Sequence, residues 1–259
     1  MPQTALITGA SGGIGLDLAR EFVRHGYNVV LVARSEDKLT AAAEELRKHN
    51  VATEVIAHDL SLPDSAQSLA AELSARNLTI DVLVNNAGYG FVGRFDQLPL
   101  DDQLGSMHLN MTTLVALTHL LLPPMIARRQ GRILNVASTA AFQPGPFMAV
   151  YYATKAFVLS FSEALWEEMR GTGVTVTALC PGPVATGFAE RAGATRSNMF
   201  KKQAVLSSPE VARAGYAACV AGKRIAVPGS SNKIVATFGR FIPKSQLLKT
   251  VRGLNSEKQ

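Results

Sequence analysis

Residues 5–15 read ALITGASGGIG, and this stretch decides the fold, because an apolar run leads straight into a glycine-rich loop and a helical pattern. Glycines let a backbone approach a phosphate closely, and the start of a helix offers free amides and a positive dipole. An ordinary glycine-rich turn is the alternative. The position of the loop between the first expected strand and the first expected helix favours a pyrophosphate-binding loop. Its candidate binding residues are Gly9, Ser11, Gly12, Gly13, Ile14 and Gly15.

Apolar runs and helical patterns alternate along the rest of the chain. The expected strands are Ala5–Thr8, Asn28–Ala33, Thr53–Ala57, Val82–Asn85, Arg132–Ala137, Val174–Cys180 and Arg224–Pro228. The expected helices are Gly15–His25, Ser35–His49, Pro63–Arg76, Leu100–Arg129 and Val150–Gly171. Strands joined through helices imply right-handed crossovers and a buried parallel sheet. The sequence therefore predicts an α/β fold, a doubly wound Rossmann-type parallel sheet of about seven strands with helices on both faces.

Composition favours one domain over two small ones. Of the 259 residues, 47% are hydrophobic and 18% are charged, which is enough for a sizeable core. No linker or internal repeat divides the chain. We expect a Rossmann-type domain over residues 1–232 and a basic, helical C-terminal extension over residues 233–259.

The cysteines and the most apolar stretch bear on cellular location. Cys180 and Cys219 form no CxxC pattern, and the five histidines show no paired spacing, so no metal site is predicted. The first expected strand leaves no room for a signal peptide, and a reducing, cytoplasmic location is expected. The stretch Leu114–Ala127 is expected to be too short to span a bilayer.

Tyr151 and Lys155 lie four residues apart in an expected helix, so the phenol and the ammonium project from the same face. A free tyrosine has a pKa of about 10, and a neighbouring cation favours the phenolate and lowers that pKa. Such a pair can exchange a proton with a carbonyl or alcohol oxygen. The spacing alone is weak evidence, but Ser138, thirteen residues earlier, strengthens it.

The end of the second expected strand bears on the choice of dinucleotide. Ala33 and Arg34 stand where an NAD-preferring site places a carboxylate for the ribose 2′-hydroxyl. A guanidinium suits a 2′-phosphate, so NADP(H) is favoured over NAD(H); a solvated arginine is the alternative. After the third expected strand, Asp59 and Leu60 could seat an adenine edge, although Asp59 could equally cap a helix or a turn.

Together these positions resemble the short-chain dehydrogenase/reductase family, in its compact branch, over roughly residues 4–230. The motifs that carry the resemblance are TGxxxGxG at Thr8–Gly15, NNAG at Asn85-Asn86-Ala87-Gly88, an asparagine at Asn110, a serine at Ser138, YxxxK at Tyr151 and Lys155, and PG at Pro181-Gly182 with Thr186 beyond.

The resemblance implies a role for each member of the catalytic set. Tyr151 would exchange a proton with the substrate oxygen, and Ser138 would hydrogen-bond that oxygen. Lys155 would lower the pKa of Tyr151 and hold the nicotinamide ribose. Asn110 would anchor a water that links Lys155 to solvent. The implied cofactor contacts outside the glycine loop are Arg34, Asp59, Leu60, Asn86, Ala87, Gly88, Tyr151, Lys155, Pro181, Gly182, Val184 and Thr186.

Structural alternatives remain for several of these residues. Ser138 could simply end a strand, and Asn110 could be a polar helix residue. Asn85 and Asn86 are expected to brace the sheet and the loop rather than to take part in chemistry. The chain also departs from some NADP-dependent members, which carry a basic residue just before the second glycine of the loop, where Gly12 stands here. A 2′-phosphate would then rely chiefly on Arg34, helped by Ser11, Ser35 or Lys38.

Substrate walls are expected from residues 140–150, from the loop after Tyr89 and from the segment after Pro183. These segments supply Phe91, Phe142, Phe147, Met148, Phe188, Met199 and Phe200, with few charges beyond Arg94, Glu190 and Arg191. An apolar ketone or secondary alcohol fits better than a sugar or a small acid, although the same residues could be core.

Two functions are compatible with these features. The leading hypothesis is an NADP-dependent oxidoreductase that moves a hydride between nicotinamide and an apolar ketone or secondary alcohol. The alternative is a catalytically silent NADP(H)-binding sensor or regulator on the same fold. A sensor has no need of the complete set of Asn110, Ser138, Tyr151 and Lys155, which favours the enzyme.

The basic residues concentrate at the C-terminus. Residues 233–259 hold six basic residues and one acidic residue, which leaves a net charge of only +1 on the body and argues against nucleic acid as a partner. Apolar residues recur at helical spacing before and after Pro243. This pattern suits either peripheral membrane contact or a helix packed on the body or on a second subunit. We favour packing, with Phe238, Phe241 and Leu248 buried.

The resemblance also implies a homodimer or larger homo-oligomer. In that family the long helices expected over residues 100–129 and 150–171 pair across a twofold axis. The side chains available for such an interface are Leu114, Leu117, Leu121, Phe157, Phe161 and Trp166.

Overall fold

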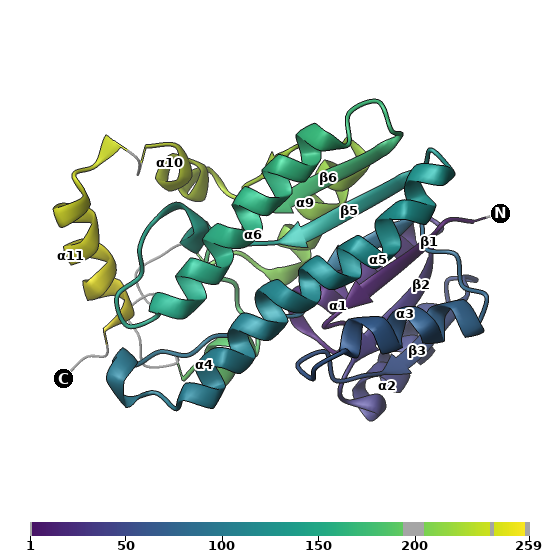
Figure 1. The fold of residues 1–259 in the computed structure, drawn as a ribbon, viewed down its shortest axis with the longest axis horizontal. Coiled ribbons are helices and arrows are strands. Elements are labelled where there is room, and N and C mark those ends of the chain that lie inside the picture. Colours follow the sequence, from purple (N-terminus) through teal and green to yellow (C-terminus); the bar gives the residue numbers. More distant parts are fainter. Residues whose placement is uncertain (1, 194–204, 239–240, 257–259) are drawn as a thin grey trace.

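The computed structural model describes residues 2–193, 205–238 and 241–256 and contains a seven-stranded parallel sheet (Figure 1). Its strands are β1 (Thr4–Thr8), β2 (Asn28–Ala33), β3 (Thr53–Ala57), β4 (Val82–Asn85), β5 (Gly131–Val136), β6 (Val174–Leu179) and β7 (Ile225–Ala226). They lie in the order β3-β2-β1-β4-β5-β6-β7, with Ile7 opposite Leu31 on one side and Val84 on the other. The predicted fold class is confirmed, and every expected strand is present within two residues of its predicted ends.

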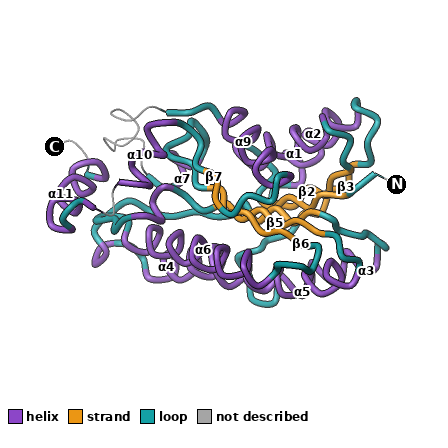
Figure 2. The backbone as a smooth tube through the Cα atoms, turned by 90° about the horizontal axis from the view of Figure 1, so that it is seen from above, coloured by secondary structure: helices purple, strands orange, loops and turns teal. Residues whose placement is uncertain are grey.

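Helices cover both faces of the sheet (Figure 2). One face carries α1 (Gly13–Arg24), α2 (Glu36–Arg47) and α9 (Ser208–Val220), and the other carries α3 (Ser65–Ala75), α4 (Leu100–Met107), α5 (Leu114–Ala127) and α6 (Ala149–Glu168). Shorter elements are η1 (Phe95–Gln97), η2 (His108–Thr113), η3 (Thr139–Phe142) and α7 (Phe188–Arg191). Helix α9 was not predicted. Its start nevertheless carries a sequence signal, because Ser207 and Glu210 form a capping box.

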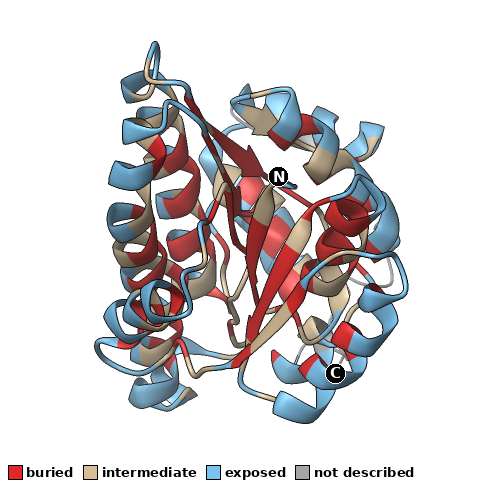
Figure 3. Ribbon diagram, turned by 90° about the vertical axis from the view of Figure 1, so that its right-hand side faces the viewer, coloured by how far each residue is buried: buried red, intermediate tan, exposed pale blue. Residues whose placement is uncertain are grey.

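The strands are buried on both sides, whereas the helices present exposed outer faces (Figure 3). Alternate residues of β1 point to opposite faces, as the pleat of a strand requires. Ile7 packs into the cluster of α1 and α2 that includes Phe22 and Leu39, and Leu6 packs into the opposite cluster with Leu69. All five side chains are fully buried, which explains why the core strands read as continuous apolar runs.

Helices α4 and α5 are joined through the π-helical turn η2 into one helix, Leu100–Ala127. In the described part of the chain this 28-residue helix is the one that is long and apolar enough to cross a membrane. The stretch Leu114–Ala127, which was expected to be too short to span a bilayer, is the second half of this helix. Leu114, Leu117 and Met125 are buried, as in the core helix of an α/β protein, and such a helix passes the same test of length and composition.

The C-terminal extension forms the two helices that Pro243 was expected to separate, α10 (Ser230–Phe238) and α11 (Lys244–Asn255). The proposed boundary at residue 232 lies inside α10. Helix α11 packs on the body through Leu247 and Val251, which are 8% and 1% exposed. The expected buried residues were wrong in part, because Phe241 is 70% exposed and Leu248 is 39% exposed. The side chain of Phe238 lies outside the described residues.

Candidate active site

A cavity of about 410 Å³ opens at the carboxyl ends of the strands, on both sides of the point where the strand order reverses between β1 and β4. Most predicted site residues line it: Gly9, Ser11, Gly12, Gly13, Ile14, Arg34, Asp59, Leu60, Asn86, Ala87, Gly88, Ser138, Tyr151, Lys155, Pro181, Gly182, Val184 and Thr186. Gly15 and Asn110 do not line the cavity but stand behind its wall.

The glycine loop can hold a pyrophosphate because two of its positions exclude any side chain. Gly9 has a φ of +67°, and a Cβ there would lie 2.8 Å from Nδ2 of Asn86. A Cβ on Gly15 would collide with the carbonyl oxygen of Gly9. Helix α1 begins at Gly13, and no side chain of the described residues caps it, so its first amides remain available to an anion. Gly15 thus shapes the loop, and its contact with a cofactor stays a prediction.

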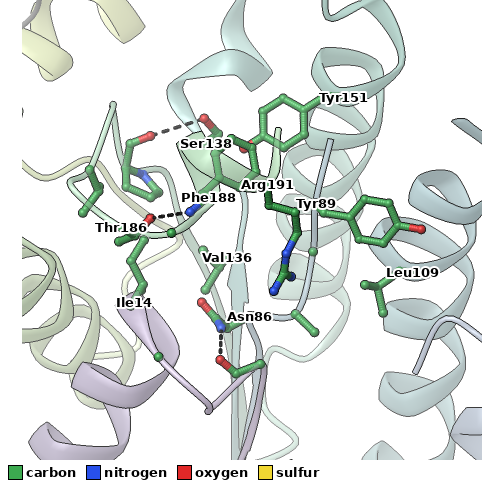
Figure 4. Close-up of a pocket in the computed structure, with 18 of the residues that line it drawn as sticks. Ile14, Asn86, Tyr89, Leu109, Val136, Ser138, Tyr151, Thr186, Phe188 and Arg191 are labelled. Atoms are coloured by element: carbon green, nitrogen blue, oxygen red, sulfur yellow. Dashed lines mark hydrogen bonds between the residues drawn. The ribbon is translucent and has the colours of Figure 1, made fainter. Parts of the chain in front are cut away.

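Asn86 braces the loop from the next strand. Its Nδ2 donates to the carbonyl oxygens of Thr8 at 2.9 Å and Gly9 at 3.3 Å, and Thr8 Oγ1 accepts from the amides of Asn86 and Ala87 (Figure 4). The bracing role predicted for Asn86 is therefore present, at the wall of the cavity.

The rim beyond β2 supplies positive charge. Arg34 is exposed and lines the cavity together with Ser35 and Lys38. Asp59 accepts hydrogen bonds on Oδ1 from the amide and the hydroxyl of Ser61, at 3.0 and 2.6 Å, so the turn expected as one alternative is present. Burial raises the pKa of Asp59, but these hydrogen bonds and the charge of Arg34 outweigh burial and lower it. Asp59 is therefore a carboxylate beside the Arg34 guanidinium.

Ser138 and Tyr151 meet where β5 ends and α6 begins (Figure 4). Ser138 Oγ accepts from the amide of Ala140 at 3.1 Å and donates to the carbonyl oxygen of Pro181 at 3.4 Å. Burial raises the pKa of Tyr151, and its hydrogen bond with Ser138 opposes that rise. The phenol is thus protonated at neutral pH and lies beside a serine hydroxyl in the cavity.

Lys155 is 5% exposed and donates from Nζ to the carbonyl oxygen of Val136 at 2.8 Å. Its Nζ lies 5.7 Å from the centroid of the Tyr151 ring. Burial lowers the pKa of Lys155 to about 8. The lowered pKa expected for Tyr151 is not found, because burial outweighs its other surroundings, and the ammonium of Lys155 donates to the carbonyl oxygen of Val136.

Asn110 lies in the π-helical turn and is 1% exposed. Its Nδ2 donates to the carbonyl oxygen of Tyr89 and to Thr154 Oγ1, and its Oδ1 accepts from the Tyr89 amide. A Cβ on Gly88 would lie 2.8 Å from Asn110 Oδ1 and 3.5 Å from Lys155 Nζ. Asn110 therefore fixes residues 88–89 next to Lys155, and its role as a water anchor stays a prediction. π-Helical turns often occur at functional sites.

The substrate wall was predicted only in part. Met148 and Phe188 line the cavity, whereas Phe142 packs into a separate core cluster. Phe91 contacts Tyr89 edge-on, and Phe147 lies under the guanidinium of Arg252. Arg94 pairs with Asp96 at the surface. Met199 and Phe200 lie outside the described residues.

Several lining residues were not predicted as site residues, notably Tyr152, Gln143, Tyr89 and Leu109. Tyr152 is 6% exposed, and its hydroxyl donates to Asn255 Oδ1 at 3.3 Å. Arg191, expected only as a nearby charge, ends α7, and Figure 4 shows its guanidinium pointing into the cavity. It is a further cation, besides Arg34 and Lys38, that a phosphorylated ligand could meet.

A family model described as short chain dehydrogenase matches residues 3–197. The very-long-chain 3-oxoacyl-CoA reductase of Rattus norvegicus is 35% identical over 259 residues, which cover 98% of this chain and 80% of that protein. The enzymes of the same name from Mus musculus and Homo sapiens match over 193 residues, so that this part of the chain spans 61% of their length.

Solved structures of similar fold include dehydrogenases as well. A short-chain dehydrogenase from Sphingobium yanoikuyae in complex with NADPH has a TM-score of 0.83 at 32% identity, covering 93% of this chain and 94% of that chain. The bulky-bulky ketone specific alcohol dehydrogenase from Comamonas testosteroni has a TM-score of 0.78 at 29% identity, covering 93% and 92%.

Proposed function

The chain belongs to the short-chain dehydrogenase family, and from that premise we propose that it is an NADP-dependent reductase of an apolar ketone, with Tyr151 as its acid and base. Family membership makes it a dehydrogenase or reductase that acts on a carbonyl or alcohol. The observation that carries the proposal is the meeting of Ser138, Tyr151 and Lys155 in one cavity with the glycine loop.

The residues of the cavity fit a dinucleotide. The glycine-rich loop at residues 9–13 and the uncapped start of α1 would hold its pyrophosphate. Arg34 and Lys38 would hold a 2′-phosphate, which supports NADP(H) over NAD(H). Arg191 offers a further cation to the phosphates. When bound, the nicotinamide supplies the hydride for reduction or accepts it in oxidation.

The protein's own part of the chemistry is the proton. The Tyr151 phenol, kept protonated by burial, donates its proton to the carbonyl oxygen as negative charge develops there. The Ser138 hydroxyl donates a hydrogen bond to the same oxygen and orients the carbonyl. In the reverse direction Tyr151 must first lose its proton, which its raised pKa opposes.

The walls near Tyr151 favour a large apolar substrate. Met148 and Tyr152 are nearly fully buried and line the cavity beside Phe188. We expect KM to fall by about fourfold for each methylene added to a straight-chain ketone, since burying one methylene contributes about 0.8 kcal/mol. Steady-state kinetics with a homologous series tests this. A KM that stays level along the series, with better use of hydroxylated ketones, would remove the apolar assignment.

The pH profile of reduction is expected to follow Lys155. Its pKa is lowered to about 8, whereas that of Tyr151 is raised, so both groups hold their protons at pH 7. If the charged ammonium is required, kcat/KM for NADPH is level below about pH 8 and falls as Lys155 loses its proton above it. Lys155→Arg keeps a cation at every accessible pH and should abolish this fall. A level wild-type profile through about pH 9, or a fall on the acid side, contradicts the assignment.

We also propose that the enzyme is at least a dimer. Leu114 and Leu117, expected at the interface, belong instead to the core, at 7% and 1% exposure. Large apolar side chains that are exposed on the same helices are Leu100, Leu104, Met107, Leu120 and Phe157. Light scattering at micromolar concentration is expected to give the mass of a dimer or more, and Leu104→Asp with Phe157→Asp to reduce it. A monomeric wild-type protein refutes the proposal.

A further inference from the structure

From the sequence, packing on the body and contact with a membrane were alternative roles for the tail. Helix α11 has one buried side and one exposed side, so that both contacts are compatible. Leu247, Val251 and Asn255 recur at helical spacing and are buried. They contact the segment that carries Met148 and Tyr152, and Asn255 Nδ2 also donates to the carbonyl oxygen of Pro146 at 2.9 Å. This side fastens the tail to the body and leaves the rest of the helix available for another contact.

Large apolar side chains are exposed on the remaining surface of the tail. Ile234 of α10 is 59% exposed, and Leu248 of α11 is 39% exposed. Phe241 and Ile242 lie between the two helices, directly before Pro243, the residue that precedes α11. They are 70% and 43% exposed. In Figures 1 and 2 both helices lie at the same end of the molecule. We call the exposed residues Ile234, Phe241, Ile242 and Leu248 the tail surface.

The charges of the tail itself are all of one sign. The sequence from Gly229 to Ser256 holds five basic residues and no acidic residue. Lys233, Lys244 and Lys249 are exposed, and the ion pairs found among the described residues involve none of them. Arg252 is exposed beside them and stacks on Phe147.

We propose that the tail surface docks the enzyme on an anionic lipid bilayer. Exposed aromatic and branched apolar side chains insert among the headgroups, while the lysines around them meet anionic lipid. A second copy fits poorly, because a twofold contact through this surface would oppose like charges, and residues 229–256 supply no carboxylate to offset them. A purely electrostatic partner such as nucleic acid would leave Phe241 and Ile242 without a role.

Docking would also bring one end of the active site to the lipid surface. Met148 and Tyr152 line the cavity and also pack against Leu247 and Val251 of α11. This consequence rests on the proposed function, because only an apolar substrate would reach the cavity from a bilayer. Docking itself is measured without substrate or cofactor, so it can fail or succeed independently of catalysis.

The test is cosedimentation of the full chain with phosphatidylglycerol–phosphatidylcholine vesicles and with pure phosphatidylcholine vesicles, at low and high salt. Binding is expected only to the anionic vesicles, weakening as salt rises. Each lysine near such a surface strengthens binding about fivefold, so Lys244→Gln with Lys249→Gln should weaken it about 25-fold. Lys48→Gln with Lys223→Gln, which changes the charge equally outside both tail helices, should leave it unchanged.

Phe241→Ser with Ile242→Ser separates a bilayer from other anionic partners. Both side chains are exposed, so the melting temperature is expected to hold while vesicle binding falls at least about tenfold. Absence of binding to anionic vesicles at low salt overturns the proposal. So does an undiminished affinity of the serine variant, which would point to an acidic macromolecule as the partner.

Discussion

Replacement of Tyr151 by phenylalanine is expected to lower turnover by about 10²–10⁴-fold, the usual contribution of general acid catalysis. The variant keeps the ring that lies 5.2 Å from Phe188 and removes only the hydroxyl beside Ser138. NADPH binding should therefore be nearly unchanged. Steady-state kinetics and a fluorescence titration with NADPH measure the two quantities separately.

Tyr152 offers a matched control, because Tyr152→Phe removes a neighbouring hydroxyl from the same cavity. That hydroxyl donates to Asn255, so its loss is expected to cost about 0.5–1.5 kcal/mol of stability. Turnover should change far less than in Tyr151→Phe. If Tyr152→Phe proved the more damaging change for turnover, the assignment of the proton donor would be wrong.

Replacement of Arg34 by aspartate is expected to raise KM for NADPH by roughly 10- to 150-fold, since a hydrogen bond to a charged group contributes about 1.5–3 kcal/mol. The new carboxylate would add to the negative charge of Asp59, whose pKa Arg34 helps to lower. It would also meet the ribose hydroxyls of NADH, so use of NADH should improve.

Lys48→Asp provides the control for Arg34→Asp. Lys48 follows the last turn of α2 and is exposed, whereas Arg34 precedes the first turn and lines the cavity. The same change of charge there should leave KM for NADPH unaltered. Equal use of NADPH and NADH by the unmodified enzyme would show that Arg34 is a solvated side chain.

The sequence predicted the sheet and the ligand loop because both are governed by local requirements. Strands buried on two faces must be continuously apolar, as in residues 5–7. A loop in which a Cβ on Gly15 would strike the backbone of Gly9 must carry glycine. Such local patterns can be recognised in the sequence without knowledge of the tertiary contacts.

Contacts between distant segments left no such pattern. Tyr152 and Asn255 are 103 residues apart, and neither position shows that they will be joined. Leu247 and Leu248 are adjacent and identical, yet only Leu247 faces the body, because the apolar spacing of α11 permits more than one buried side. The π-helical turn around Asn110 was also unpredictable, since the apolar pattern continues through it.

At the catalytic centre, the pKa of Tyr151 could not be predicted from the sequence either. The spacing of Tyr151 and Lys155 places both groups on one side of α6, as predicted. It does not show that the carbonyl oxygen of Val136 holds the ammonium or that the phenol is buried. Those facts reverse the expected direction of the pKa and favour Tyr151 as a proton donor.

The central claim is that this cavity performs reduction and does not merely bind a dinucleotide. Oxidation of NADPH, followed by its absorbance across a panel of hydrophobic ketones, is the measurement that decides between these two possibilities. We predict that one alcohol is formed for each NADPH oxidised, and that this turnover is lost in Tyr151→Phe. Tight binding of NADPH with no oxidation across the whole panel would contradict it.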